Sequence, residues 1–121
     1  MLQHCSAKYL LAIVSLVKHG TIEERQQALR DADLERYFSF IRFTTDNKDA
    51  AFEEALQHFG FKPAEVAIVD DRAVRGIRWG NTKGCLTFWL RKGKFSTETL
   101  PPTEHQAIHV IADLSPLLKL L

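Results

Sequence analysis

The stretch that decides the fold is Val66-Ala67-Ile68-Val69-Asp70-Asp71, a short apolar run that stops at two adjacent carboxylates. A run of apolar, mostly β-branched residues predicts a strand buried on both faces, as in a parallel sheet. Open α/β sheets bind their ligands beyond the carboxyl ends of the strands. Two interpretations follow: the acids hold a hard cation such as Mg²⁺, or one of them caps the next helix.

The composition indicates one soluble globular domain. The chain has 121 residues, of which 45% are hydrophobic and 26% charged, enough apolar material for a core. The formal net charge is only +1, so no overall field favours nucleic acid or a membrane surface as a partner. Cys5 and Cys85 lie far apart without metal-ligand spacing, which is typical of small buried residues in a reducing compartment.

The apolar run at residues 9–17 resembles part of a signal peptide, but no small-x-small cleavage site follows it. The run is also too short to span a bilayer. We therefore interpret it as a buried first strand and expect a cytoplasmic protein.

Strand and helix patterns alternate along the chain. Thr21 and Glu24 predict a capping box for the first helix, Asp46 is expected to cap the second, and Gly60 to end it. This alternation predicts an α/β fold, a three-layer, doubly wound (Rossmann-like) parallel sheet of about five strands. The expected strands are residues 9–14, 37–43, 66–70, 86–90 and 107–111, and the expected helices are residues 22–31, 47–59, 72–82 and a short one from Ser115.

Six segments, in this order and spacing, carry a family resemblance: residues 11–15 (LAIVS), 34–41 (LERYFSFI), 48–60 (KDAAFEEALQHFG), 62–71 (KPAEVAIVDD), 83–90 (KGCLTFWL) and 111–118 (IADLSPLL). Together they resemble the core of a haloacid dehalogenase-like (HAD) phosphohydrolase, from its second motif to its C-terminus. Residues 11–15 are similar to the second motif, Lys48 to the third, and residues 62–71 to the run into the fourth. The resemblance covers nearly all of residues 1–121, as a single HAD-like domain without a cap domain.

The resemblance implies Mg²⁺-dependent chemistry on a phosphorylated small molecule. The Ser15 hydroxyl would donate to a phosphoryl oxygen, and Lys48 would neutralise charge on the transferring group. Asp71, with Asp70, would hold Mg²⁺. The plainer alternatives stay open, in which Ser15 only satisfies the following loop and Lys48 is a solvated residue in the first turn of a helix.

The sequence departs from the family pattern in two ways. The family begins with Asp-x-Asp-x-Thr/Val, which supplies the nucleophile and the general acid/base, and residues 1–121 contain no such motif. The acid expected about five residues after Asp71 is also absent, and Arg75 and Gly76 stand there, although the family also uses an Asp-Asp version. We therefore expect a phosphohydrolase-type domain that is inactive or incomplete alone.

The absent first strand lies at the centre of the family's sheet, between the strands that correspond to residues 9–14 and 66–70. Without it, we expect these two strands to pair directly, in the order last–fourth–third–first–second. A homodimer, or a partner chain that supplies the missing motif, is the other expected arrangement. A fragment of a longer enzyme, a subunit of a split enzyme and a degenerate stand-alone domain all agree with the sequence.

The alternative function is a non-catalytic binding or assembly module derived from a HAD fold. In that interpretation the two acids are relics, and the aromatic strands serve packing or dimerisation. Arg72, Arg75 and Arg78 recur every third residue, which favours a solvated helix face over a phosphate-binding rim. A requirement for Asp71 in Mg²⁺-dependent activity would distinguish an enzyme from a module.

Overall fold

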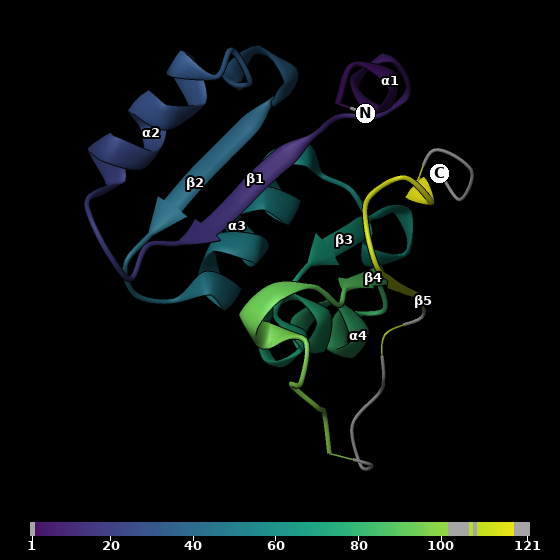
Figure 1. Cartoon of the computed structure of the whole chain (residues 1–121). Coiled ribbons are helices and arrows are strands. Elements are labelled where there is room, and N and C mark those ends of the chain that lie inside the picture. The colour runs from purple at the N-terminus through teal and green to yellow at the C-terminus, as the bar shows by residue number, and fades with distance from the viewer. Residues whose placement is uncertain (1, 102–106, 108, 118–121) are drawn as a thin grey trace. The chain divides into compact units, whose positions relative to one another are not determined.

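A computed structural model describes residues 2–101, 107 and 109–117 of the chain (Figure 1). Its contacts group the chain into two compact units, Met1–Phe59 and Gly60–Leu120, and each unit is described by itself. The predicted alternation of strands and helices is confirmed, and every strand pairing in the described residues is parallel. The expected single domain over residues 1–121 stays a prediction.

The first unit is built on two parallel strands, β1 (Ala12–Leu16) and β2 (Phe40–Thr44), with Ala12 opposite Phe40. Helix α2 (Ile22–Asp31) connects the strands, and α3 (Lys48–Phe59) packs against both of them. A short helix, α1 (Leu2–Lys8), precedes β1, and a 3₁₀ turn, η1 (Glu35–Tyr37), precedes β2.

The start of the first unit differs from the prediction. The strand expected at residues 9–14 begins at Ala12, and Tyr9 and Leu10 are 46% and 59% exposed. Helix α1 was not predicted, because Cys5 is its one buried residue and its sequence has no apolar periodicity. The strand expected at residues 37–43 likewise begins later, at Phe40, because η1 occupies Glu35–Tyr37.

Helix α2 begins at the predicted capping box. The Glu24 N–H donates to Thr21 Oγ1 at 3.1 Å, and the Thr21 N–H donates to Glu24 Oε2 at 3.3 Å. Each side chain thus satisfies one backbone N–H that the helix itself leaves without a partner.

The predicted cap of α3 is wrong by one residue. The helix begins at Lys48, and Asn47 Oδ1 accepts the Ala50 N–H at 3.2 Å. Asp46 instead donates its own N–H to Thr44 Oγ1, at 3.3 Å, within the loop that precedes the cap. Gly60 ends the helix as predicted, with a φ of +71° that favours glycine.

The second unit contains a parallel sheet in the order β3–β4–β5. Its strands are β3 (Ala67–Asp70), β4 (Leu86–Leu90) and β5 (His109–Ile111). β4 has the predicted bounds, and β5 is the described part of the last predicted strand, of which Ile108 lies outside the described residues. Of the helix expected from Ser115, residues 118–121 lie outside the described residues too. Two 3₁₀ turns, η2 (Pro63–Glu65) and η4 (Gly93–Phe95), precede β3 and follow β4.

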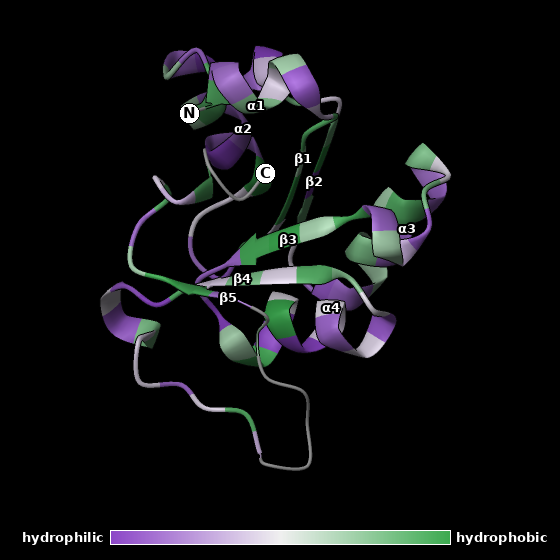
Figure 2. Ribbon diagram, turned by 90° about the vertical axis from the view of Figure 1, so that its right-hand side faces the viewer, coloured by the Kyte–Doolittle hydropathy of each residue, from purple (hydrophilic) through white to green (hydrophobic). Residues whose placement is uncertain are grey.

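A π-helical turn, η3 (Ala73–Ile77), follows β3 and continues into α4 (Arg78–Lys83). Figure 2 shows α4 against one side of the β3–β4–β5 sheet. Gly80 allows this close packing, because a Cβ there would lie 2.8 Å from a Thr87 methyl carbon and 2.9 Å from Cδ1 of Ile68. The core beneath includes Phe88 and Ile77, both with 0% exposure, so the glycine that weakens the helix prediction serves helix–sheet packing.

Each unit has a parallel sheet of its own, and the predicted α/β fold with about five strands is confirmed. β1 pairs with β2 in the first unit and β3 pairs with β4 in the second, while the direct pairing of residues 9–14 with residues 66–70, which would join the units, stays a prediction. The neighbours within each sheet are the predicted ones. Each sheet packs against helices of its own unit, α3 on β1 and β2, and η3 and α4 on β4. Local packing therefore stabilises the sheet of each unit.

The capping box gives the first test of the structure. Thr21→Ala should lower the free energy of unfolding by about 0.5–2 kcal/mol, because the first turn of α2 loses its side-chain acceptor. Thr21→Ser keeps a hydroxyl and should unfold close to the wild type. Urea denaturation followed by circular dichroism measures both, and equal midpoints for the alanine and serine variants would contradict the cap.

Candidate functional site

Asp70 is the last residue of β3, and its carboxylate is bonded to the backbone that follows. Asp70 is 9% exposed, its Oδ1 accepts the Arg72 N–H, and its Oδ2 accepts the Gly76 N–H, each at 3.0 Å. The Arg72 N–H precedes η3 and the Gly76 N–H belongs to its fourth residue, so the carboxylate ties the end of β3 to the interior of η3. Asp70 therefore stabilises the turn as the capping interpretation supposed, although the residue at the N-cap position of η3 is Arg72, which makes no side-chain cap bond.

Gly76 makes this bond possible. A Cβ at position 76 would lie 2.2 Å from Asp70 Oδ2, so any side chain there would collide with the carboxylate. The sequence resemblance places an acid in this region, where the chain has glycine. The absence of a side chain lets the acid of β3 reach the backbone of η3 directly.

Asp71 differs from its neighbour, because it is exposed. Its backbone C=O accepts the indole N–H of Trp89 at 3.0 Å. Trp89 lies in β4, in register with Asp70. The two bonds, one to the Asp70 carboxylate and one from Trp89, fix the backbone on both sides of Asp71 at the carboxyl end of the sheet.

Arg72 forms a partly buried ion pair and does not lie on a solvated helix face. Its Nε and Nη2 each lie 2.9 Å from Glu98 Oε2, and the two side chains are 22% and 17% exposed. The guanidinium carbon lies 3.8 Å from the centroid of the Phe95 ring, a cation–π distance. The favoured interpretation of the three arginines is thus wrong for Arg72, although Arg78 is exposed.

Ser15 and Lys48 lie in the first unit, at the same edge of its sheet. Ser15 is near the carboxyl end of β1, opposite Phe43, and Lys48 opens α3 shortly after β2 ends at Thr44. Both side chains are partly buried, and Lys48 Nζ lies 5.5 Å from the Phe52 ring centroid. Ser15 and Lys48 thus lie at the carboxyl edge of the β1–β2 sheet. Asp70 and Asp71 lie at the carboxyl edge of the β3–β4–β5 sheet.

The described residues do not form a metal cluster by themselves. Among residues 2–101, 107 and 109–117, no group of three or more His, Cys, Asp or Glu side chains is placed to hold a metal ion. Mg²⁺ takes carboxylate and water oxygens in an octahedral shell. Asp71 offers an exposed carboxylate for such a shell, whereas both Asp70 oxygens already accept N–H groups.

Sequence reasoning missed three residues around the acid pair, namely Trp89, Phe95 and Glu98. From the sequence, Trp89 is expected to be a core residue of a strand, and Glu98 is expected to be a solvated acid in a long loop. No spacing relates Glu98 to Arg72, which is 26 residues earlier in the chain. The basic residues at positions 91–94 were the one feature of the sequence that could have indicated a functional role for this segment.

Asp113, in the segment after β5, has a lowered pKa. Asp113 Oδ1 accepts the Ser115 hydroxyl at 2.5 Å and the Ser115 N–H at 2.8 Å. These two bonds, the hydroxyl first, lower the pKa of Asp113 below its ordinary value of 3.8, and the charge of Lys92 lowers it further.

Comparison with known families identifies the chain. Residues 47–117 match the HAD-hydrolase-like family, over more than half of the chain. The chain belongs to the HAD-hydrolase-like family. The resemblance of its motifs is thereby confirmed at the level of the family. No curated protein matches the chain.

Solved HAD structures share the fold of this HAD-like chain. The putative HAD-hydrolase YfnB from Bacillus subtilis, bound to magnesium, has a TM-score of 0.80 and 20% identity, with 99% of this chain and 52% of that chain covered. A HAD phosphatase from Thermococcus onnurineus has a TM-score of 0.74 and 21% identity, with 98% and 54% covered. An uncharacterized protein from Listeria monocytogenes serotype 4b has a TM-score of 0.71 and 20% identity, with 91% and 71% covered. The chain thus spans about half the length of the first two structures.

None of the described helices has the length and apolar character needed to span a membrane. Cys5 and Cys85 are both buried and unbridged, as the sequence predicted.

The contact between Gly76 and Asp70 predicts a coupled loss of stability. Gly76→Ala should lower the free energy of unfolding by about 1–3 kcal/mol, because the new Cβ displaces a buried carboxylate from its N–H partner. In an Asp70→Ala background the same change should cost much less, because the colliding oxygen is absent. Chemical denaturation of the four proteins in this double-mutant cycle measures the coupling. An equal cost of Gly76→Ala in both backgrounds would contradict the contact.

The Asp113 bonds predict a pH effect with a definite sign. Because the folded pKa lies below the unfolded one, the carboxylate contributes stability above the ordinary pKa of 3.8, and this contribution is lost as the pH falls through the folded value. A ¹³C NMR titration should show a lowered pKa for this carboxyl. Ser115→Ala should raise it toward the ordinary value, and Ser115→Thr should not. A carboxyl that titrates identically in wild type and Ser115→Ala would exclude the hydroxyl as the main cause.

Proposed function

We propose that residues 1–121 supply the phosphate- and metal-binding part of a Mg²⁺-dependent HAD phosphohydrolase, while the nucleophilic carboxylate comes from outside these residues. The observation that carries this proposal is the exposed Asp71 on a backbone fixed from both sides at the carboxyl end of β3. Family membership supports phosphate-ester chemistry, and one fold neighbour is bound to magnesium. The substrate class is a phosphorylated small molecule, and the expected compartment is the cytoplasm.

In this proposal each residue has a distinct role. Asp71 provides the main carboxylate ligand of Mg²⁺. Both Asp70 oxygens accept backbone N–H groups, so Asp70 can bind the metal only through its remaining lone pairs. Its main role is to fix the turn. The Ser15 hydroxyl donates to a phosphoryl oxygen, and the Lys48 ammonium offsets the charge that develops on the transferring group. The remaining metal ligands come from the part that carries the nucleophile, and from water.

The chemistry that this arrangement serves is a two-step transfer. A carboxylate oxygen forms a bond to phosphorus while the bond to the leaving alcohol breaks, and water then cleaves the acyl phosphate. Bound Mg²⁺ would reduce the electrostatic repulsion between the negatively charged phosphate and the attacking carboxylate. Ser15 and Lys48 act on the phosphoryl oxygens in both steps, so they would lower the barrier without forming a covalent bond themselves.

The edge of β3 that has no strand partner within its own unit supports a strand supplied from elsewhere. Among the described residues of the second unit, β3 pairs on one side alone, with β4. Edge strands usually carry charges, proline or a bulge that prevents further pairing, whereas Ala67-Ile68-Val69 has none of these and Val69 is 40% exposed. A parallel strand added there would end at the same sheet edge as Asp71. Its source is a longer polypeptide, a partner chain or a second copy of this chain in a homodimer.

The alternative function is a non-catalytic binding or assembly module. The observation that favours it is the structural use of Asp70, whose two oxygens are engaged in the turn. A module needs no nucleophile and no metal. It would retain the fold and an interaction surface on the strands, with no phosphatase activity under any condition.

A phosphatase assay with p-nitrophenyl phosphate and Mg²⁺ separates the two functions. The chain alone should show little or no turnover, because a positioned nucleophile is absent. Addition of a polypeptide that carries an Asp-x-Asp-x-Thr strand should raise turnover by at least about 100-fold. Asp71→Asn should abolish this gain, whereas Asp33→Asn, at a 78% exposed side chain in the first unit, should not.

Two outcomes would contradict the proposal. Strong Mg²⁺-dependent turnover by the chain alone would show that a residue within 1–121 acts as the nucleophile. Binding of the added strand without turnover would favour the module.

A further inference from the structure

The contacts of Arg72 form a small cluster at the carboxyl end of β3. We use the name Arg72 cluster for Arg72, Lys94, Phe95 and Glu98. The guanidinium donates twice to Glu98 Oε2, at 2.9 Å from both Nε and Nη2, and stacks on the Phe95 ring at 3.8 Å. Lys94 Nζ lies 5.0 Å from the centroid of the same ring. Two cations thus contact the Phe95 ring, and one of them, Arg72, is paired with a single carboxylate.

The fit between Arg72 and Glu98 is incomplete. Both donors of the guanidinium converge on one carboxylate oxygen, Oε2. The other oxygen, Oε1, is buried and has no hydrogen-bond partner among the described residues. A guanidinium edge matches two acceptor oxygens of a carboxylate or a phosphate, one for each donor. A phosphate group would use both donors of Arg72 with separate oxygens, which Glu98 does not.

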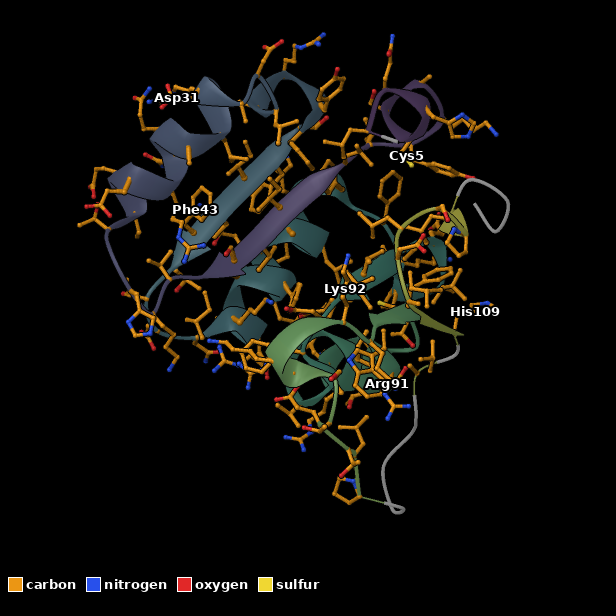
Figure 3. The ribbon with its side chains drawn as sticks, viewed as in Figure 1. Cys5, Asp31, Phe43, Arg91, Lys92 and His109 are labelled. Carbon is orange, nitrogen blue, oxygen red and sulfur yellow. The ribbon has the colours of Figure 1, made fainter. Side chains whose placement is uncertain are left out.

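The surroundings of the cluster are positive. Arg91 and Lys92 lie in the turn after β4 (Figure 3), and both are exposed, as is Lys94. Arg91 donates from Nε to the Ser96 carbonyl at 2.9 Å, which holds this basic turn against the segment that carries Phe95. Three exposed cations thus lie within residues 91–94, and their charges together attract anions to this segment.

We propose that Arg72, Lys94 and Phe95 form a phosphate-binding subsite, which Glu98 closes as an internal substitute for the ligand. An incoming phosphate group takes the place of the Glu98 carboxylate on the guanidinium. Lys94 supplies a second positive charge, and the Phe95 ring holds the guanidinium in position by stacking. Glu98 can turn outward because its neighbours, Thr97 and Thr99, are exposed. In the proposed phosphohydrolase this subsite would bind a second anionic group of the substrate, and this role rests on the proposed function. The binding of phosphate to the subsite is independent of that function.

The test is a calorimetric titration of the full chain with inorganic phosphate in the presence of EDTA. Glu98→Gln should tighten binding by about tenfold, because a neutral amide competes for the guanidinium without charge assistance. Arg72→Gln combined with Glu98→Gln should abolish this gain. The double variant removes both charges together, so it leaves no buried unpaired charge to unfold the protein. Arg78→Gln is the matched control, since it removes one positive charge at an exposed position.

Two results would overturn the subsite. One is an equal phosphate affinity of wild type and Glu98→Gln, and the other is a double variant that binds phosphate as tightly as Glu98→Gln. NMR shifts that are confined to Arg72 Nε–H and the Phe95 ring during the titration would support it. Shifts confined to Ser15 and Lys48 would place the anion elsewhere and contradict it. Because no metal and no turnover enter this experiment, its failure is separate from a failure of the proposed phosphohydrolase activity.

Discussion

The Asp70 carboxylate is the constraint on which the second unit depends. A buried carboxylate is costly unless hydrogen bonds replace its hydration, and here two backbone N–H groups do so. Those bonds join the end of β3 to Arg72 and to the interior of η3, so they set the direction of the turn that contains Asp71. Gly76 is required at the far side, because the carboxylate occupies the space of a side chain there. One interaction therefore determines the backbone at the candidate site and the residue type six positions later.

The same constraint divides the two acids into different roles. Successive residues at the end of a strand point to opposite faces, so Asp70 and Asp71 cannot both turn toward η3. Asp70 faces η3 and is buried, and Asp71 is exposed. Two adjacent carboxylates thus have different surroundings, one bonded within the turn and one exposed. Sequence alone could not predict which acid is buried, because either one is chemically suited to accept the backbone N–H groups.

Local signals predicted most of the elements, and the strand neighbours within each unit are also the predicted ones. Thr21 with Glu24, Gly60 and the run at residues 86–90 are each decided by side chains within one turn or one strand, and they were predicted correctly. Asp46 and Asn47 are equally good caps, so only the geometry of the loop chose between them. Strand pairing is decided by packing between distant residues. The expected joining of two strands into one sheet was therefore an inference from an absent neighbour and not from a signal in the strands.

The arginine pattern failed for a specific geometric reason. A spacing of three predicts a shared helix face only if all three residues are helical. Arg72 has φ −101° and ψ 103°, an extended conformation, and η3 begins one residue later, at Ala73. Its side chain therefore leaves the backbone in a different direction from those of Arg75 and Arg78. The Asp70 carboxylate accepts the N–H of this same residue. The bond that fixes the backbone at Asp71 therefore also positions Arg72, whose guanidinium lies against Glu98 and Phe95.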